Sequence, residues 1–168
     1  MLFFISGELM KKTKIKGFMT TDVVTASPDD TIKDVVKKLA ENDISGIPII
    51  DGERNILGMI SEKDILTALK TESRSLSLVF PSSHALGMTF EEAISYRELK
   101  EAMEELQNSK VEKIMNRDVI SIDENITITE TASIMINNNI NRIPIVKNGK
   151  LVGIITRGDI INALSKVK

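Results

Sequence analysis

Two pairs of polar residues carry the side chains in this sequence that are best suited to hold a ligand. Ser61 precedes Asp64, and Thr156 precedes Asp159, with two residues between the members of each pair. Each pair stands where an apolar run gives way to a helical pattern. The first turn of a helix offers unpaired N–H groups and a partial positive charge, which suit an anionic or polyhydroxy ligand. A carboxylate accepts hydrogen bonds from sugar hydroxyls, and a Ser or Thr hydroxyl can contact a phosphate oxygen.

The same residues also fit an ordinary helix start. Ser and Thr are common N-caps, and acidic residues are favoured in the first helical turn. One pair alone would favour this purely structural interpretation. Two pairs at matching places in a repeat shift the balance towards ligand binding, and both interpretations stay open at this point.

The pairs belong to an internal repeat. Met19 matches Met115 at the start of each copy, and Asp64 matches Asp159 near its end, at a spacing one residue shorter. Each copy has the pattern strand, helix, strand, strand, helix. One copy alone would bury too little surface to be stable. We therefore predict a mixed α/β (α+β) fold in which two β-α-β-β-α units pack sheet to sheet.

The elements expected in each copy follow from apolar periodicity and capping residues. In the first copy we expect strands at 23–25, 47–50 and 56–60, a helix capped by Thr31 and Asp34 that ends at 42–43, and a helix at 62–69 with Ile65, Leu66 and Leu69 inward. In the second copy we expect strands at 119–121, 143–146 and 151–155, a turn at 123–125, a helix capped by Thr127 and Glu130 that ends at 137–139, and a helix at 159–164.

Four segments follow from this alignment: a lead-in at 1–13, a first motif at 14–70, an insert at 71–110 and a second motif at 111–168. In the insert we expect a Ser-rich loop at 71–83 and an amphipathic helix that starts at a capping box of Thr89 and Glu92. An insert of this length is too long for an ordinary connection. It either packs one helix on the body or contacts a partner.

The composition argues against several classes of function. The sequence has no cysteine and one histidine, which argues against disulfides, thiolate metal sites and histidine-rich metal sites. A net charge of −2 and 4% aromatic residues give no basis for nucleic-acid binding. No apolar run has the length of a membrane span. We therefore expect a soluble cytoplasmic protein with no catalytic cofactor and no nucleic-acid or membrane partner, and we do not expect an enzyme.

The repeated segments resemble a known family. The runs IPII and IPIV, with GMISEKDIL and GIITRGDII, are similar to the marks of the CBS domain, which is named for cystathionine beta-synthase. The resemblance covers residues 14–70 and 111–168, so the chain resembles a tandem CBS pair, or Bateman module, that stands alone with an insert between its motifs. Such pairs commonly bind adenosine compounds in two clefts between the motifs, and they usually form flat homodimers.

The resemblance implies a regulatory module that senses AMP, ADP or ATP and passes the signal to a separate, unidentified protein. S-adenosylmethionine or methylthioadenosine is an alternative ligand. A module that binds no small ligand and serves interaction or dimerisation is a second alternative.

The family pattern also implies two sets of site residues. One motif supplies an aspartate for the ribose and a hydroxyl for phosphate, and the other supplies its first strand and pre-proline segment for the base. The main cleft would contain Thr156, Asp159 and Arg142, with Val24, Ile44, Ser45 and Ile47 around the base. The second cleft would contain Ser61 and Asp64, with Ile120, Ile140, Asn141 and Ile143 around the base. The apolar members also fit plain core positions.

Arg142 makes the two clefts unequal. It precedes the Ile143-Pro144 strand, whereas Gly46 holds the matching place in the first motif. A guanidinium can make two charge-assisted hydrogen bonds to a phosphate, and glycine can make none. We therefore expect the main cleft to take the phosphorylated ligand, with Arg157 adding charge beside it. Arg142 as a solvated surface residue is the plainer interpretation.

Overall fold

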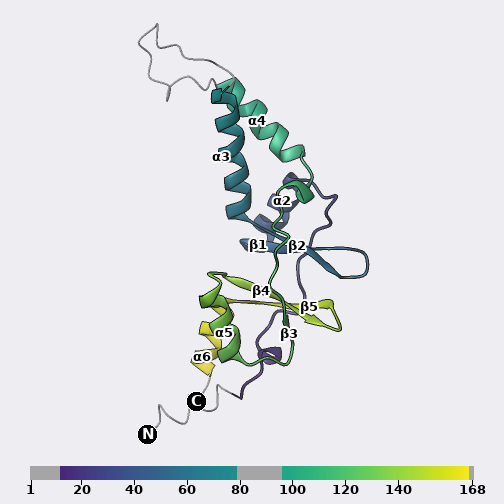
Figure 1. The fold of residues 1–168 in the computed structure, drawn as a ribbon, viewed down its shortest axis with the longest axis vertical. Coiled ribbons are helices and arrows are strands. Elements are labelled where there is room, and N and C mark those ends of the chain that lie inside the picture. Colours follow the sequence, from purple (N-terminus) through teal and green to yellow (C-terminus); the bar gives the residue numbers. More distant parts are fainter. Residues whose placement is uncertain (1–11, 79–95, 167–168) are drawn as a thin grey trace. The chain divides into compact units, whose positions relative to one another are not determined.

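A computed structural model describes residues 12–78 and 96–166 (Figure 1). The capping box expected at Thr89 and Glu92 lies outside the described residues, as does most of the lead-in. The described elements are η1 (Ile15–Gly17), α2 (Ile32–Asn42), β1 (Gly46–Ile50), β2 (Ile56–Ser61), α3 (Glu62–Leu78), α4 (Tyr96–Asn108), η2 (Val111–Lys113), β3 (Ile122–Asp123), α5 (Ile128–Asn137), β4 (Arg142–Lys147), β5 (Lys150–Thr156) and α6 (Arg157–Lys166).

These elements form the mixed helix and strand fold that the repeat predicts. Strands β1 and β2 pair in one small sheet, and β3, β4 and β5 form another in that order. Strand β3 runs parallel to β4, and β4 runs antiparallel to β5. The order of strands and helices in the second motif is therefore β-α-β-β-α.

The prediction is wrong about the first strand of each copy. Residues 23–25 form no strand, and only Ala26 pairs there, through a parallel bridge to Ile49. In the second copy the strand is β3, which lies just after the expected residues 119–121. Side chains that favour a strand indicate an extended chain, but the partner strand decides which residues pair.

The helix boundaries agree well with the prediction. Thr31 Oγ1 accepts the Asp34 N–H at 3.2 Å, and Asp34 Oδ2 accepts the Thr31 N–H at 3.0 Å, so both halves of the capping box are present. Thr127 and Glu130 form the same box at the start of α5. Helix α2 ends at Asn42, and its C-cap, Asp43, has a φ of 52°, in the left-handed region that asparagine and aspartate tolerate.

Helix α3 differs from the prediction in two respects. It continues to Leu78, so residues 71–78, expected as a loop, are helical. Leu66, expected to face inward, is 64% exposed. Helix α3 packs against α4, as Figure 1 shows, and this contact gives the extra turns of α3 a neighbour. In α4, Ala102 and Leu106 are buried while Met103 is exposed, so α4 is amphipathic.

The chain forms two compact units that do not coincide with the two sequence motifs. One unit contains Met1–Val24, Ile50–Ile56 and Asp118–Lys168, and the other contains Thr25–Ile49 and Leu57–Arg117. The first residues of each motif, 14–24 and 111–117, therefore belong to the unit that holds most of the other motif, and we call them the exchanged segments. The internal repeat does not predict this exchange, because it aligns each of these segments with the rest of its own motif.

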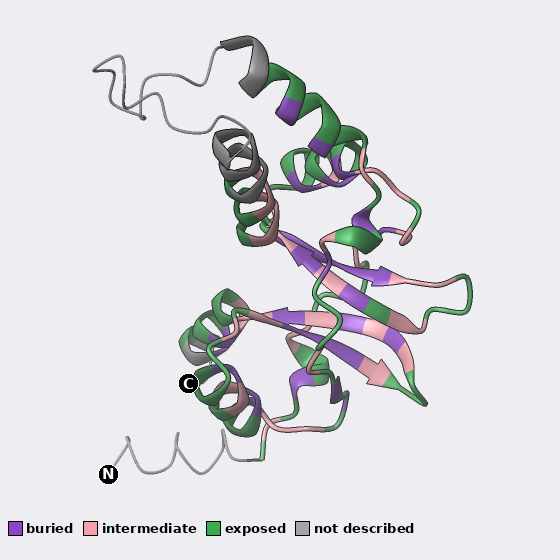
Figure 2. Ribbon diagram, turned by 45° about the horizontal axis from the view of Figure 1, so that its top comes forward, coloured by how far each residue is buried: buried purple, intermediate pink, exposed green. Residues whose placement is uncertain are grey.

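Backbone hydrogen bonds fix both exchanged segments. Thr20 and Ile154 donate their N–H groups to each other's carbonyls, both at 2.9 Å. Met59 and Asn116 do the same in the other unit, both at 2.8 Å. Figure 2 shows the buried residues concentrated on the strands and on one side of the helices. The core of the first unit includes Ile15, which lies in the exchanged segment.

A glycine allows each exchanged segment to approach its strand. A Cβ on Gly153 would lie 2.8 Å from Met19 Sδ and 3.1 Å from the Thr20 carbonyl. A Cβ on Gly58 would lie 2.7 Å from Met115 Sδ. Both distances are shorter than ordinary packing allows. In each copy of the repeat, the glycine therefore leaves the space that the methionine side chain occupies.

Glu124, in the turn that the sequence predicts at 123–125, is buried between two lysines. Its carboxylate lies 2.8 Å from Lys147 Nζ and 3.2 Å from Lys16 Nζ. Hydrogen bonds from Lys147 and then Lys16 hold the pKa of this carboxyl below its usual range. The turn therefore also anchors the exchanged segment that carries Lys16.

Candidate functional site

The start of α6 brings Thr156 and Asp159 together. Asp159 Oδ2 accepts the Thr156 N–H at 2.8 Å and the Thr156 hydroxyl at 2.7 Å. Thr156 Oγ1 in turn accepts the Asp159 N–H at 3.2 Å. The pair is therefore a capping box, as the structural interpretation of the sequence required.

The start of α3 holds the matching pair in a similar way. Asp64 Oδ2 accepts the Ser61 N–H at 2.8 Å and also accepts the Ser61 hydroxyl. Both aspartates are half-buried. Within the described part of the chain, hydrogen bonds reach only Oδ2 of each carboxylate. Capping and ligand binding are thus compatible, because Oδ1 remains to accept a hydroxyl from a ligand.

Arg142 lies in the same unit as this helix start. It begins β4, and the register of β4 and β5 places it directly opposite Thr156. The side chain is partly buried, with its Nη1 atom fully so. The backbone thus brings a guanidinium, a hydroxyl and a carboxylate to one end of the β4–β5 pair. Such a group suits an anion that also carries hydroxyl groups.

The other predicted site residues are divided between the units. Val24 lies in the unit of Thr156, whereas Ile44, Ser45 and Ile47 lie in the other unit. For the second cleft, Ser61 and Asp64 lie in one unit, and Ile120, Ile140, Asn141 and Ile143 lie in the other. The assembly of each cleft from two units stays a prediction.

The predicted base-binding residues differ in how far their side chains are exposed. Ile47 and Ile143 are 1% and 0% exposed, so their side chains belong to the cores of their own units. Val24, Ile44, Ile120 and Ile140 are half-buried. Ser45 and Asn141 are exposed. The plain core interpretation is therefore correct for the side chains of the two pre-proline isoleucines.

Arg157 has a structural role that the sequence did not indicate. Its Nε donates to the Ile140 carbonyl at 3.1 Å, and its N–H donates to the Asn141 carbonyl at 3.0 Å. The side chain is thus tied to the segment expected to face the base in the second cleft. The sequence pattern did not predict this contact, because Arg157 and Ile140 are far apart along the chain.

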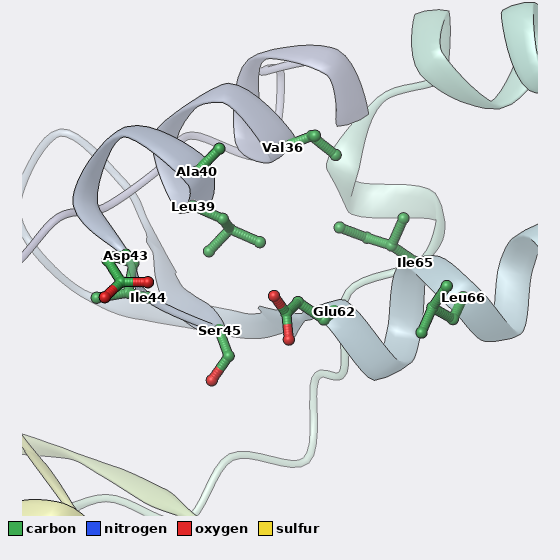
Figure 3. Close-up of a pocket in the computed structure, with 9 residues that line it drawn as sticks. All are labelled: Val36, Leu39, Ala40, Asp43, Ile44, Ser45, Glu62, Ile65 and Leu66. Carbon is green, nitrogen blue, oxygen red and sulfur yellow. The ribbon is translucent and has the colours of Figure 1, made fainter.

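In the first motif, residues 44–45, which match residues 140–141 of the second, border a pocket. The pocket has a volume of about 620 Å³ and lies between α2, the segment 43–45 and the start of α3. Figure 3 shows the Glu62 carboxylate between the two helices, and Leu39 and Ile65 facing each other across the space. Pockets of this size commonly hold small ligands.

Within 12–78 and 96–166, no group of three His, Cys, Asp or Glu side chains is placed to hold a metal ion. In that same part of the chain, no helix combines the length and apolarity needed to cross a membrane.

Comparison with known proteins gives a consistent result. The family model described as "CBS domain" matches residues 15–71 and 111–166. The uncharacterised protein MJ1426 of Methanocaldococcus jannaschii is 36% identical over 162 residues, which cover 95% of this chain and 94% of that protein.

Solved structures share the fold. CBSX2 in complex with AMP has a TM-score of 0.67 at 22% identity, over 92% of this chain and 98% of that one. The CBS domain pair of MJ0100, in complex with 5-methylthioadenosine and S-adenosyl-L-methionine, has a TM-score of 0.64 at 22% identity, over 93% of this chain and 98% of that one. At this level of identity, the similarity shows the fold alone.

Proposed function

Because the chain belongs to the CBS domain family and carries two copies of its motif, we propose that it is a non-catalytic regulatory module that binds AMP, ADP or ATP. CBS pairs are regulatory ligand-binding modules, and the structural neighbours named above hold AMP in one case and S-adenosylmethionine with methylthioadenosine in the other. These ligands have the adenosine group in common.

The arrangement of Thr156, Asp159 and Arg142 carries the choice of a phosphorylated ligand. The Asp159 carboxylate is oriented by its capping bonds, which leaves Oδ1 for a ribose hydroxyl. Thr156 and Arg142 lie opposite each other across two strands, so a hydroxyl and a guanidinium stand close to the same helix start. A phosphate next to that helix start would gain from all three features.

The base would be held by the other motif. We propose that Val24, Ile44, Ser45 and Ile47 surround it in the main cleft, largely through backbone groups where the side chain is core. A second cleft would combine Ser61 and Asp64 with Ile120, Ile140, Asn141 and Ile143. It has no arginine in the place of Arg142, because Gly46 stands there.

S-adenosylmethionine or methylthioadenosine is the alternative ligand, supported by the complex of the MJ0100 pair. Neither carries a phosphate, so neither would depend on Arg142. The direct experiment is calorimetric titration of purified, ligand-free protein with AMP, ATP, S-adenosylmethionine and methylthioadenosine, repeated with Asp159→Ala. Micromolar binding of a phosphorylated compound that Asp159→Ala abolishes supports the proposal. Absence of binding to all four compounds contradicts it.

We also propose that the protein is a homodimer that acts on a separate protein. Among the described residues, the most exposed large apolar side chains lie on helices: Leu66 at 64% in one unit, and Ile136 at 73% and Ile161 at 64% in the other. We propose that a second copy of the chain covers part of this apolar surface, as interfaces commonly do. Light scattering after size exclusion should give the mass of a dimer, and Ile161→Lys should shift it to a monomer. Asn162→Lys, a change to an exposed neighbour, is the matched control.

A further inference from the structure

The residue that begins the last helix differs between the two motifs. Arg157 begins α6, and Glu62 begins α3. The backbone around them is bonded alike: the Arg157 N–H donates to the Asn141 carbonyl at 3.0 Å, and the Glu62 N–H donates to the Ser45 carbonyl at 3.2 Å. The two motifs therefore form a matched comparison for the effect of one side chain.

In the second motif, the Arg157 side chain adds a tie to the segment 140–141. Its Nε donates to the Ile140 carbonyl at 3.1 Å. The Ile140 N–H donates to the Met135 carbonyl at 3.0 Å, and Asn139 just before it has a φ of 51°. The segment is thus held by α5 on one side and by two hydrogen bonds from Arg157 on the other.

In the first motif, the residue at the place of Arg157 is Glu62, which gives the Ile44 carbonyl no such tie. The Ile44 N–H donates to the Leu39 carbonyl at 3.1 Å, and Asp43 has a φ of 52°. Glu62 carries a carboxylate, which accepts hydrogen bonds and cannot donate one to the Ile44 carbonyl. Within the described residues, no hydrogen bond or ion pair engages that carboxylate, which Figure 3 shows beside the pocket. Ile44 and Ser45 also line this pocket.

We propose that Arg157 is a positioning residue for the second cleft. It holds Ile140 and Asn141 in the conformation that receives the base, so the second cleft binds adenosine with less loss of freedom and discriminates between bases more strictly. The main cleft, where the carboxylate of Glu62 cannot donate a hydrogen bond to the Ile44 carbonyl, discriminates less. The inference rests on the proposed function. Its physical basis is that a segment ordered before binding spares the ligand the cost of ordering it.

Titration with adenosine and guanosine tests this, because neither carries a phosphate. In the wild-type protein, the site that Asp64→Ala abolishes is the second cleft. Arg157→Gln should weaken adenosine at that site by about three- to fivefold, which corresponds to the loss of one exposed hydrogen bond. The ratio of adenosine to guanosine affinity should fall with it. Arg157→Lys should restore part of the adenosine affinity and part of the affinity ratio, because an ammonium can still donate a hydrogen bond to the Ile140 carbonyl.

The competing role of Arg157 is a charge beside the phosphate in the main cleft. That role predicts that Arg157→Gln, made in the Asp64→Ala protein, weakens AMP while the second cleft of the otherwise wild-type protein keeps its affinity for adenosine. This outcome would overturn the proposal. The proposal expects the reverse: Arg157→Gln leaves AMP affinity unchanged in the Asp64→Ala protein and weakens adenosine at the second cleft of the otherwise wild-type protein.

The first motif offers the reciprocal change. Glu62→Arg places a guanidinium where Arg157 stands in the repeat, and it should tighten adenosine in the main cleft by a similar factor. Glu62→Gln, which removes the charge but adds no comparable reach, is the control. Equal effects of the two substitutions would show that charge, rather than the tie, is the cause.

Hydrogen exchange gives a readout that needs no ligand. The peptide spanning residues 138–143 should exchange faster in Arg157→Gln than in the wild-type protein, and the peptide spanning 42–47 should be unchanged. If the wild-type protein binds no adenosine compound, the proposed function fails while this measurement still tests the tie. If the wild-type protein binds adenosine but Arg157→Gln alters neither exchange nor affinity, the inference alone fails.

Discussion

Arg142 lies directly opposite Thr156 in the antiparallel pairing of β4 with β5. Thr156 is also the N-cap of α6 and shares two hydrogen bonds with the carboxylate of Asp159. One strand pair thus sets the separation between a cation, a hydroxyl and an acid. This geometry is local to one unit, so it does not depend on the arrangement of the rest of the chain.

The first prediction concerns Arg142. Arg142→Gln should weaken AMP by about tenfold or more, because a charge-assisted contact to phosphate is lost. Adenosine should bind the substituted protein as it binds the wild type. Isothermal calorimetry with both ligands measures the difference. Equal weakening of adenosine and AMP would show that Arg142 supports the fold of the site and does not contact a phosphate.

The second prediction separates capping from ligand binding at Thr156. Thr156→Ala and Thr127→Ala each remove an N-cap hydroxyl that accepts an N–H from the third helical residue. Each should lower the free energy of unfolding by about 1 kcal/mol, as measured in urea. Only Thr156→Ala should also weaken nucleotide binding. If Thr127→Ala weakens it equally, the effect comes from stability alone.

The third prediction concerns the close approach at Gly153. Gly153→Ala should lower the free energy of unfolding by about 1–3 kcal/mol, because the new Cβ would press on Met19 Sδ and the Thr20 carbonyl. Gly52→Ala is the control, since nothing lies within 4 Å of a Cβ there.

A double substitution checks the cause. Met19→Ala should recover part of the loss caused by Gly153→Ala, because the sulfur contact is then gone, although the Thr20 carbonyl remains. Simple addition of the two losses would contradict the contact as the origin of the effect. Thermal unfolding of the four proteins gives the required comparison.

The fourth prediction concerns pH. The two lysines that donate to Glu124 lower the pKa of its carboxyl in the folded protein. The stabilisation is therefore complete above the pKa of the unfolded chain, about 4.3, and it is lost as the pH falls through the lower folded value. Glu124→Gln should flatten the decline of stability below about pH 5. Glu105→Gln, at an exposed position, should leave the decline unchanged.

The parts of the fold that could be predicted from the sequence are those set by local signals. Thr31 with Asp34 and Thr127 with Glu130 fixed the helix starts, and the asparagine and aspartate clusters fixed the ends. The strand at 23–25 failed because pairing depends on a distant partner, and here a single residue, Ala26, pairs.

Other features were missed for the same physical reason. Leu66 fits an apolar helical face, but no neighbour within the described chain covers it. The tie from Arg157 to Ile140 joins residues that are distant in sequence, so no local pattern predicts it. At the candidate site, residue types and spacing identified Thr156 and Asp159, and only the strand register placed Arg142 opposite Thr156.

The exchanged segments have a consequence for how the chain is made. Ile15 is buried among residues of the second motif, including Ile122 and Ile155, and its N–H donates to the Ile126 carbonyl. A nascent chain that has emerged only as far as the first motif therefore holds a segment whose partners have not yet been synthesised. Contacts between such distant residues slow folding and keep apolar surface open to other molecules for longer. The packing around Ile15 is thus completed only after the second motif has been synthesised.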